Sequence, residues 1–133
     1  MSHEPLISIV DDDESVRDAV QTLLESTGRR TVAFASAEQF LASPALSTAQ
    51  CLILDLRMPG IDGVELLRRM LAANHRIPTI ILTAHADEVE RARALAAGAM
   101  AFLPKPFRPA FLLEAVEASL RRASNASDNP GGS

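Results

Sequence analysis

Five short apolar runs, separated by stretches of helical periodicity, constrain the fold of this chain more than any other feature of its sequence. The runs cover residues 6–10, 31–35, 52–54, 79–82 and 101–103. Apolar runs that are this short and sharply bounded are typical of strands buried on both faces. Strict alternation of such strands with helices predicts an α/β fold, in which a parallel sheet has right-handed crossovers and is covered by helices on both sides.

Each apolar run is followed by a helical pattern. The longer patterns cover about residues 14–27, 63–73 and 87–97, a short helix opens at a capping box of Ser36 and Gln39, and the last helix begins near Pro109. Apolar side chains at helical spacing should pack on the sheet. For the 63–73 and 87–97 helices these are Val64, Leu67, Leu71, Val89, Ala92 and Leu95 or Ala96.

The length of 133 residues suits one domain with a substantial core. We assign residues 1–122 to that domain and the polar residues 123–133 to a flexible tail or linker. A net charge of −4 gives no electrostatic case for nucleic-acid binding. No signal peptide is evident, and no apolar stretch approaches the ~20 residues that span a bilayer, so we expect no membrane contact. Cys51 is the only cysteine and should be an inert core thiol, which fits a reducing cytoplasm.

Polar residues that follow the apolar runs supply a candidate site. All strands of a parallel sheet point the same way, so the residues just past them share one edge, where α/β folds bind ligands. Asp13 and Glu14 are explained as charges that favour the N-terminus of the next helix. The residues expected at the shared edge are Asp11 and Asp12 after the first run, Asp55 after the third, Thr83 after the fourth and Lys105 after the fifth.

The chemistry of these residues indicates phosphoryl transfer. Asp11, Asp12 and Asp55 would repel one another unless a cation lies among them, and their hard oxygen ligands suit Mg²⁺ or Mn²⁺. Lys105 adds a positive charge that could pair with Asp55 or with an anion attached to it. In such a site the metal, Lys105 and Thr83 would bind phosphoryl oxygens while the Asp55 carboxylate attacks in line.

The same residues stand in motifs that resemble the receiver domain of two-component response regulators, over roughly residues 6–120. Each motif is weak alone, but their order and their places at strand ends are highly specific. Within the family, the chain is most similar to the receivers of FixJ-like and NarL-like transcription regulators. The resemblance implies a flavodoxin-like, five-stranded doubly wound sheet of order 2-1-3-4-5. The motifs are Ile9-Val10-Asp11-Asp12-Asp13, Leu54-Asp55-Leu56-Arg57-Met58-Pro59, Asp62-Gly63, Leu82-Thr83-Ala84, Gly98-Ala99 and Lys105-Pro106-Phe107.

The resemblance also implies a role for each acidic residue. Asp55 would be the phosphoacceptor for a sensor histidine kinase or a His-phosphotransfer protein. Asp12 and Asp55 would bind Mg²⁺ directly, together with the backbone carbonyl of Arg57, and Asp11 would act mainly through water. The protein would be a phosphoacceptor switch that catalyses its own phosphorylation and dephosphorylation, and not a turnover enzyme.

Further roles implied by the resemblance concern the phosphoryl group and its readout. Thr83 would hydrogen-bond the phosphoryl group, and Lys105, aimed by a cis bond to Pro106, would pair with it. Phe102 would fill the space that Thr83 vacates, which changes the surface of the last two helices and the last strand. A simple core or edge aromatic is the alternative for Phe102. Homodimerisation on phosphorylation is a further possibility.

Two other readings remain open from the sequence. Asp11 and Asp13 superficially match the paired aspartates of haloacid-dehalogenase-like phosphatases, although Glu14-Ser15 departs from that family's continuation and no cap is evident. A pseudo-receiver that binds partners without phosphorylation is the second alternative. Arg57 and His85 lie two residues after Asp55 and Thr83, where family members tune phosphoryl lifetime; plain surface roles explain them equally well.

Overall fold

The computed structural model describes residues 4–127 and contains one five-stranded, fully parallel sheet. The strand order is β2-β1-β3-β4-β5, which confirms the predicted doubly wound fold. Three of the strands are longer than the apolar runs, since β3 starts at Ala49, β4 ends at Thr83 and β5 includes Pro104. The strands are β1 (Leu6–Val10), β2 (Arg30–Phe34), β3 (Ala49–Leu54), β4 (Thr79–Thr83) and β5 (Ala101–Pro104).

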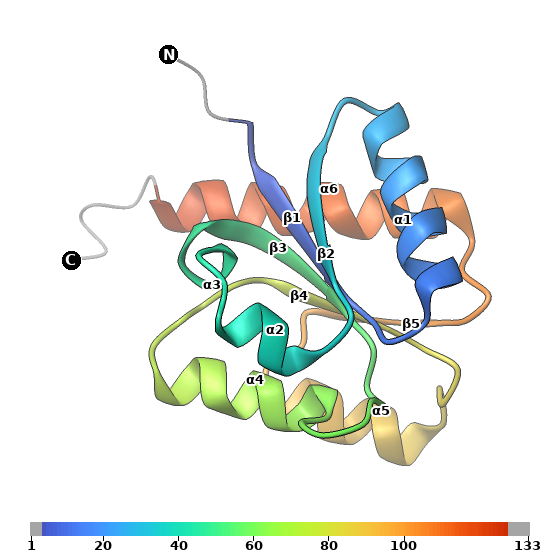
Figure 1. The fold of residues 1–133 in the computed structure, drawn as a ribbon, viewed down its shortest axis with the longest axis vertical. Helices are drawn as coiled ribbons and strands as arrows, with labels where there is room; N and C mark the ends of the chain where they lie inside the picture. Colours follow the sequence, from blue (N-terminus) through green and yellow to red (C-terminus); the bar gives the residue numbers. More distant parts are fainter. Residues whose placement is uncertain (1–3, 128–133) are drawn as a thin grey trace.

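Helices cover both faces of the sheet (Figure 1). On one face lie α1 (Glu14–Ser26) and α6 (Pro109–Ser127). On the other lie α2 (Ala37–Leu41), α3 (Ala45–Thr48), α4 (Gly63–Ala72) and α5 (Glu88–Ala96). The short α3 is additional to the helices expected from the sequence, so the last two predicted helices are α5 and α6.

The central strands feed two separate cores. Successive strand residues point to opposite faces, so Cys51 and Ile53 pack under α1 and α6, whereas Leu52 and Leu54 pack under α2, α4 and α5. All four side chains are almost completely buried. Burial on both faces explains why residues 51–54 of β3 form a continuous apolar run and why a charge directly after it is conspicuous.

Side-chain caps fix where four helices begin. Asp13, Ser36, Asp62 and Asp87 each accept a hydrogen bond from a backbone N–H in the first turn of the helix that follows. The Asp13 cap confirms its expected role at the start of α1. The predicted capping box of Ser36 and Gln39 forms in part. The N–H of Gln39 donates to Oγ of Ser36, but the Gln39 amide oxygen accepts from the N–H of Ala35.

The predicted inward face of α5 is wrong. Val89 is 69% exposed and Leu95 40% exposed, and Ala92 and Ala96 are exposed as well. Buried instead are Glu90 and Ala94, with Ala97 just beyond the helix. Small alanines let the helix lie close to the sheet, and the carboxylate of Glu90 is neutralised by arginines, so the apolar spacing of Val89 and Leu95 does not decide the face.

The expected burial of Leu71 also differs from the structure. Leu71 of α4 is 46% exposed, because Leu66 and Met70 share the buried face with Val64 and Leu67. Helix α6 continues to Ser127, beyond the predicted end of the domain at residue 122. The rest of the predicted tail, residues 128–133, lies outside the described residues. Within residues 4–127, none of the helices combines the length and apolar character needed to cross a membrane.

Candidate functional site

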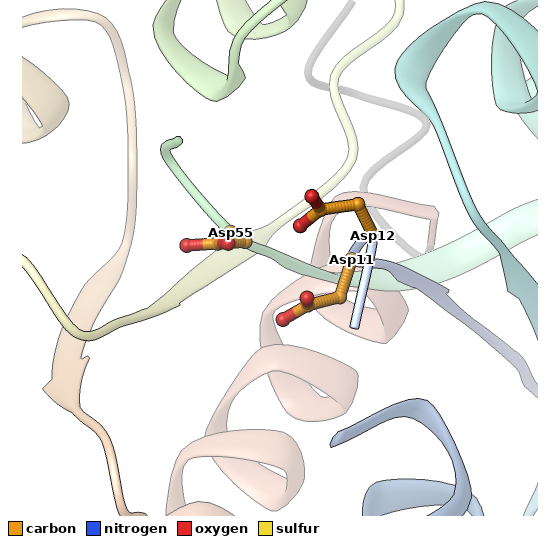
Figure 2. Close-up of side chains that lie close together, drawn as sticks. All are labelled: Asp11, Asp12 and Asp55. Carbon is orange, nitrogen blue, oxygen red and sulfur yellow. The ribbon is translucent and has the colours of Figure 1, made fainter. Parts of the chain in front are cut away.

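Three aspartates meet at the carboxyl edge of the sheet, as the sequence predicts. Asp11 and Asp12 follow β1, and Asp55 follows β3, its neighbour in the sheet. Figure 2 shows the three side chains close together on the ends of these strands. One carboxylate oxygen from each lies within 4.8 Å of the others. Asp11 and Asp55 are buried and Asp12 is exposed, so the cluster opens to solvent on one side.

Lys105 reaches this cluster from the chain after β5. Its Nζ lies 2.8 Å from Oδ2 of Asp11 and 3.5 Å from Oδ2 of Asp55. The closer partner is therefore Asp11, whereas the sequence suggested Asp55 as the pair. Three carboxylates against one ammonium leave two net negative charges in the cluster, which is the charge that one divalent cation neutralises.

The pKa values of the cluster follow from burial and from this pairing. Burial raises the pKa of Asp11, although hydrogen bonds from Lys105 and from the N–H of Asp13 act in the opposite direction. For Lys105, partial burial acts to lower the pKa, but the hydrogen bond and charge of Asp11 and the charge of Asp55 outweigh it and raise the pKa. Lys105 is thus a firmly cationic group among the carboxylates.

Asp11 and Asp55 are the two buried carboxylates of the cluster. Among the described residues, Oδ1 of Asp55 is their one oxygen without a hydrogen-bond or ion-pair partner, and it is buried. A buried carboxylate oxygen without a donor is costly, and a cation or a covalent electrophile removes that cost. The oxygens of the three aspartates, of which Asp12 is open to water, fit Mg²⁺ or Mn²⁺. The arrangement therefore suits a hard divalent cation beside a nucleophilic carboxylate.

The backbone around Asp55 is fixed on both sides. Its N–H donates to the carbonyl of Val10 at 3.0 Å, which continues the pairing of β1 and β3. Gly63, the first residue of α4, packs directly on the chain after β3: a Cβ at this position would lie 2.5 Å from the carbonyl oxygen of Asp55 and 2.9 Å from Cα of Leu56. The Asp62-Gly63 motif thus supplies a cap and a close approach, which holds the Asp55 backbone in place.

Thr83 and Lys105 are coupled through the backbone. Thr83 ends β4, is fully buried, and its Oγ1 accepts a hydrogen bond from the N–H of His85 at 3.1 Å. The N–H of Lys105 donates to the carbonyl of Thr83 at 2.9 Å, and the Lys105–Pro106 peptide bond is cis. Phe102, on the adjacent β5, is half-buried against the core under α2, α4 and α5.

Two residues near the site were not foreseen from the sequence. Arg17 of α1 donates through Nη1 to the carbonyl of Asp11 at 2.8 Å. Glu90 of α5 is buried and accepts hydrogen bonds from Arg57 and Arg93, which lower its pKa, Arg93 most. The Arg57–Glu90 pair spans 33 positions in the chain, so no local pattern could have indicated it.

Sequence comparison agrees with the geometry of the site. The family model described as response regulator receiver domain matches residues 7–117, most of the chain. The chain belongs to this family. Receiver domains are the signal-receiving modules of two-component systems, so the resemblance drawn from the motifs is confirmed.

Individual relatives point in the same direction. Transcriptional regulatory protein FixJ of Bradyrhizobium diazoefficiens is 41% identical over 121 residues, which cover 90% of this receiver domain and 58% of FixJ. The structure of response regulator StyR superposes with a TM-score of 0.87 at 40% identity, covering 94% of this chain and 63% of StyR. The BeF3-activated DrrB receiver domain superposes with a TM-score of 0.81 at 28% identity, covering 90% and 99% of the two chains. The chain thus spans little more than half the length of FixJ, a transcriptional regulator.

Proposed function

We propose that this receiver domain accepts a phosphoryl group on Asp55 from a histidine kinase or a His-phosphotransfer protein, in a reaction that needs Mg²⁺ and also proceeds with Mn²⁺. The observation that carries the proposal is the buried, unpartnered Oδ1 of Asp55, set between acidic neighbours and an ammonium. This oxygen has no structural partner to lose when it forms a bond to phosphorus.

In the proposed reaction, an oxygen of the Asp55 carboxylate attacks phosphorus in line as the bond from phosphorus to the donor's nitrogen or oxygen breaks, and the donor keeps that electron pair. Asp11, Asp12, Asp55 and the carbonyl of Arg57 would hold the metal. The metal supplies positive charge beside the phosphoryl oxygens. Lys105, already beside Asp11 and Asp55, pairs with one phosphoryl oxygen. The Thr83 hydroxyl donates to another, while accepting from His85 as now.

The output would be a changed surface on α5, β5 and α6. Thr83 moves toward the phosphoryl group, and Phe102 takes the vacated space beside it, which alters the packing of β5 against α5. A second copy of the receiver or an output domain would read this surface. Water later hydrolyses the aspartyl phosphate at the same site. A single buried, unpaired cysteine fits a reducing compartment, so we place these events in the cytoplasm.

Acetyl phosphate and Mg²⁺ provide the direct test. We expect the mass of the intact wild-type protein to rise by one phosphoryl group, and the gain to disappear when Mg²⁺ is chelated. Asp55→Asn, which keeps the shape of the side chain, should gain nothing. A wild-type protein that remains unmodified, or Asp55→Asn that is modified as well, would contradict the proposal.

The same preparations test the phosphatase alternative. The carboxylate of Asp13 accepts hydrogen bonds from the N–H and the hydroxyl of Ser15 and caps α1, so it is engaged away from Asp11. We therefore expect no turnover of a phosphate monoester. Turnover that Asp11→Asn abolishes and Asp55→Asn leaves intact would favour the phosphatase.

A further inference from the structure

A chain of three charges links the loop after Asp55 to helix α5. Glu90 accepts a hydrogen bond from Nε of Arg57 at 3.1 Å and another from Nη1 of Arg93 at 2.7 Å. The Glu90 side chain is covered by its neighbours, with 7% of it exposed, whereas the side chains of Arg57 and Arg93 are 55% and 46% exposed. Glu90 is also fixed through its backbone, because its N–H donates to the capping carboxylate of Asp87.

The two arginines are not equivalent partners of Glu90. Arg93 lies on the same helix, three residues further on, and makes the shorter contact. Arg57 lies in the loop after β3 and contacts Glu90 through Nε alone; within residues 4–127 its terminal Nη groups donate no hydrogen bond. A buried carboxylate needs at least one cationic partner. Arg93 supplies that partner, and Arg57 can therefore leave Glu90 without stranding a buried charge.

Arg57 also lies close enough to Asp55 in the chain to respond to a new anion on it. Only Leu56 separates the two residues, which limits the distance between their Cα atoms to about 7 Å. Leu56 is buried, whereas the Arg57 side chain runs along the surface to Glu90. A phosphoryl group adds about two negative charges, and a guanidinium binds such oxygens in a bidentate manner. Glu90 and a phosphoryl group on Asp55 would thus compete for one guanidinium.

We propose that Glu90 is a positioning residue for Arg57: it holds the guanidinium on α5 until an anion on Asp55 draws it away, while Arg93 keeps Glu90 neutralised. The inference rests on the proposed phosphorylation of Asp55. It makes Arg57 a second phosphoryl-binding cation beside Lys105. It also gives α5 a direct ionic connection to the site, separate from the path through Thr83 and Phe102. Because the coupling is reciprocal, a partner that binds α5 only while Arg57 contacts Glu90 will weaken the binding of the phosphoryl group at Asp55.

The test measures, at fixed salt, how tightly wild type and four variants bind beryllofluoride, the activating ligand of the DrrB receiver domain, in the presence of Mg²⁺. Glu90→Gln releases Arg57, so we expect the dissociation constant of beryllofluoride to fall about five-fold, the lower end of typical coupling between sites. Arg93→Gln leaves Glu90 with Arg57 alone, so the constant should rise by about the same factor. Arg57→Gln keeps its backbone carbonyl and loses the guanidinium. In that background, Glu90→Gln should have no effect.

The opposite signs of Glu90→Gln and Arg93→Gln separate positioning from a purely structural role, which would weaken binding in both. An effect of Glu90→Gln that persists without Arg57, or an Arg93→Gln variant that binds as tightly as wild type, overturns the inference. Should Glu90→Gln fail to fold, as judged by its melting transition, the Arg93→Gln comparison decides alone. Wild type that binds no beryllofluoride, although it folds and binds Mg²⁺, contradicts the proposed function itself; binding that is normal but insensitive to these substitutions contradicts only the role of Glu90.

Discussion

Lys105 stands between two carboxylates, and this position places opposite demands on metal binding and on phosphorylation. Its ammonium repels a divalent cation that the aspartates attract, yet it attracts the incoming phosphoryl group. For Lys105→Met we expect Mg²⁺ to bind about tenfold more tightly, which corresponds to ~1.4 kcal/mol of relieved repulsion. Phosphorylation by acetyl phosphate should be slower despite the tighter metal. Calorimetric titration with Mg²⁺ and a mass-based time course measure the two effects.

The control for Lys105→Met is Arg108→Met, which removes an exposed cation from the same segment. The guanidinium of Arg108 lies over the ring of Phe111. Mg²⁺ affinity should be unchanged in this variant. Equal changes in both variants would mean that net charge of the molecule, and not the Lys105 contact, governs the metal site.

The first turn of α4 has to touch the backbone of Asp55, and only glycine permits it. For Gly63→Ala the added Cβ would overlap the Asp55 carbonyl, so we expect a loss of about 1–3 kcal/mol of stability in a urea titration. Because the loop after β3 must shift, Mg²⁺ binding should weaken as well.

Gly28→Ala separates crowding from backbone strain. Gly28 has a positive φ of 83°, but a Cβ there would meet nothing within 4 Å. We expect Gly28→Ala to lower stability, because a left-handed backbone is unfavourable for a residue with a Cβ. Mg²⁺ binding should stay intact. If Gly63→Ala also bound Mg²⁺ normally, the close approach of α4 would have no part in shaping the site.

The elements themselves could largely be predicted, whereas some of their faces could not. Burial on both sides makes residues 51–54 of β3 and 80–82 of β4 continuous apolar runs, and capping aspartates mark where α1, α4 and α5 begin. The face of α5 escaped prediction because Glu90 is buried in ion pairs with Arg93 and with Arg57, the second of which is distant in the chain. Hydrophobic spacing ranks Val89 above Glu90, but tertiary ion pairing reverses the order.

The residues of the site could be predicted from the topology of the sheet, whereas the ion pairs and hydrogen bonds among them could not. Parallel strands bring Asp11, Asp12, Asp55 and Lys105 to one edge whatever the details of packing. Which carboxylate Lys105 contacts more closely depends on side-chain geometry at the level of an ångström, and the sequence carries no record of it. The same holds for Arg17, whose contact is with a backbone carbonyl.

Cys51 reports on opening of the whole molecule, because it lies between the sheet and the helices α1 and α6. Burial raises the pKa of its thiol to about 12. Since the thiolate is the reactive form, a disulfide reagent at pH 8 should label the native protein only through unfolding, at a rate that rises with urea in step with the unfolded fraction.

The raised pKa of Cys51 also sets a direction for stability at alkaline pH. Above the ordinary thiol value of 9.0, the unfolded chain loses a proton that the native chain retains up to about 12. The native state then binds more protons, so its stability falls as pH rises through this window. Cys51→Ala should remove this part of the decline in urea titrations. Rapid labelling of the folded protein in the absence of urea would show that the thiol is not enclosed.

Phe102 allows the link between the phosphorylation site and the distant surface to be tested across the whole molecule. It lies on β5 with part of its side chain against the core beneath α2, α4 and α5, beside the strand that ends in Thr83. In wild type, beryllofluoride with Mg²⁺ should change amide hydrogen exchange in α5, β5 and the start of α6.

Phe102→Ala removes the ring and leaves the aspartates, Thr83 and Lys105 untouched. We expect it to bind beryllofluoride with nearly wild-type affinity while the exchange changes in β5 and α6 largely disappear. Those in α5 should persist in part, since Arg57 and Glu90 connect the site to that helix directly. Exchange changes that survive intact in Phe102→Ala would assign the aromatic residue to packing alone.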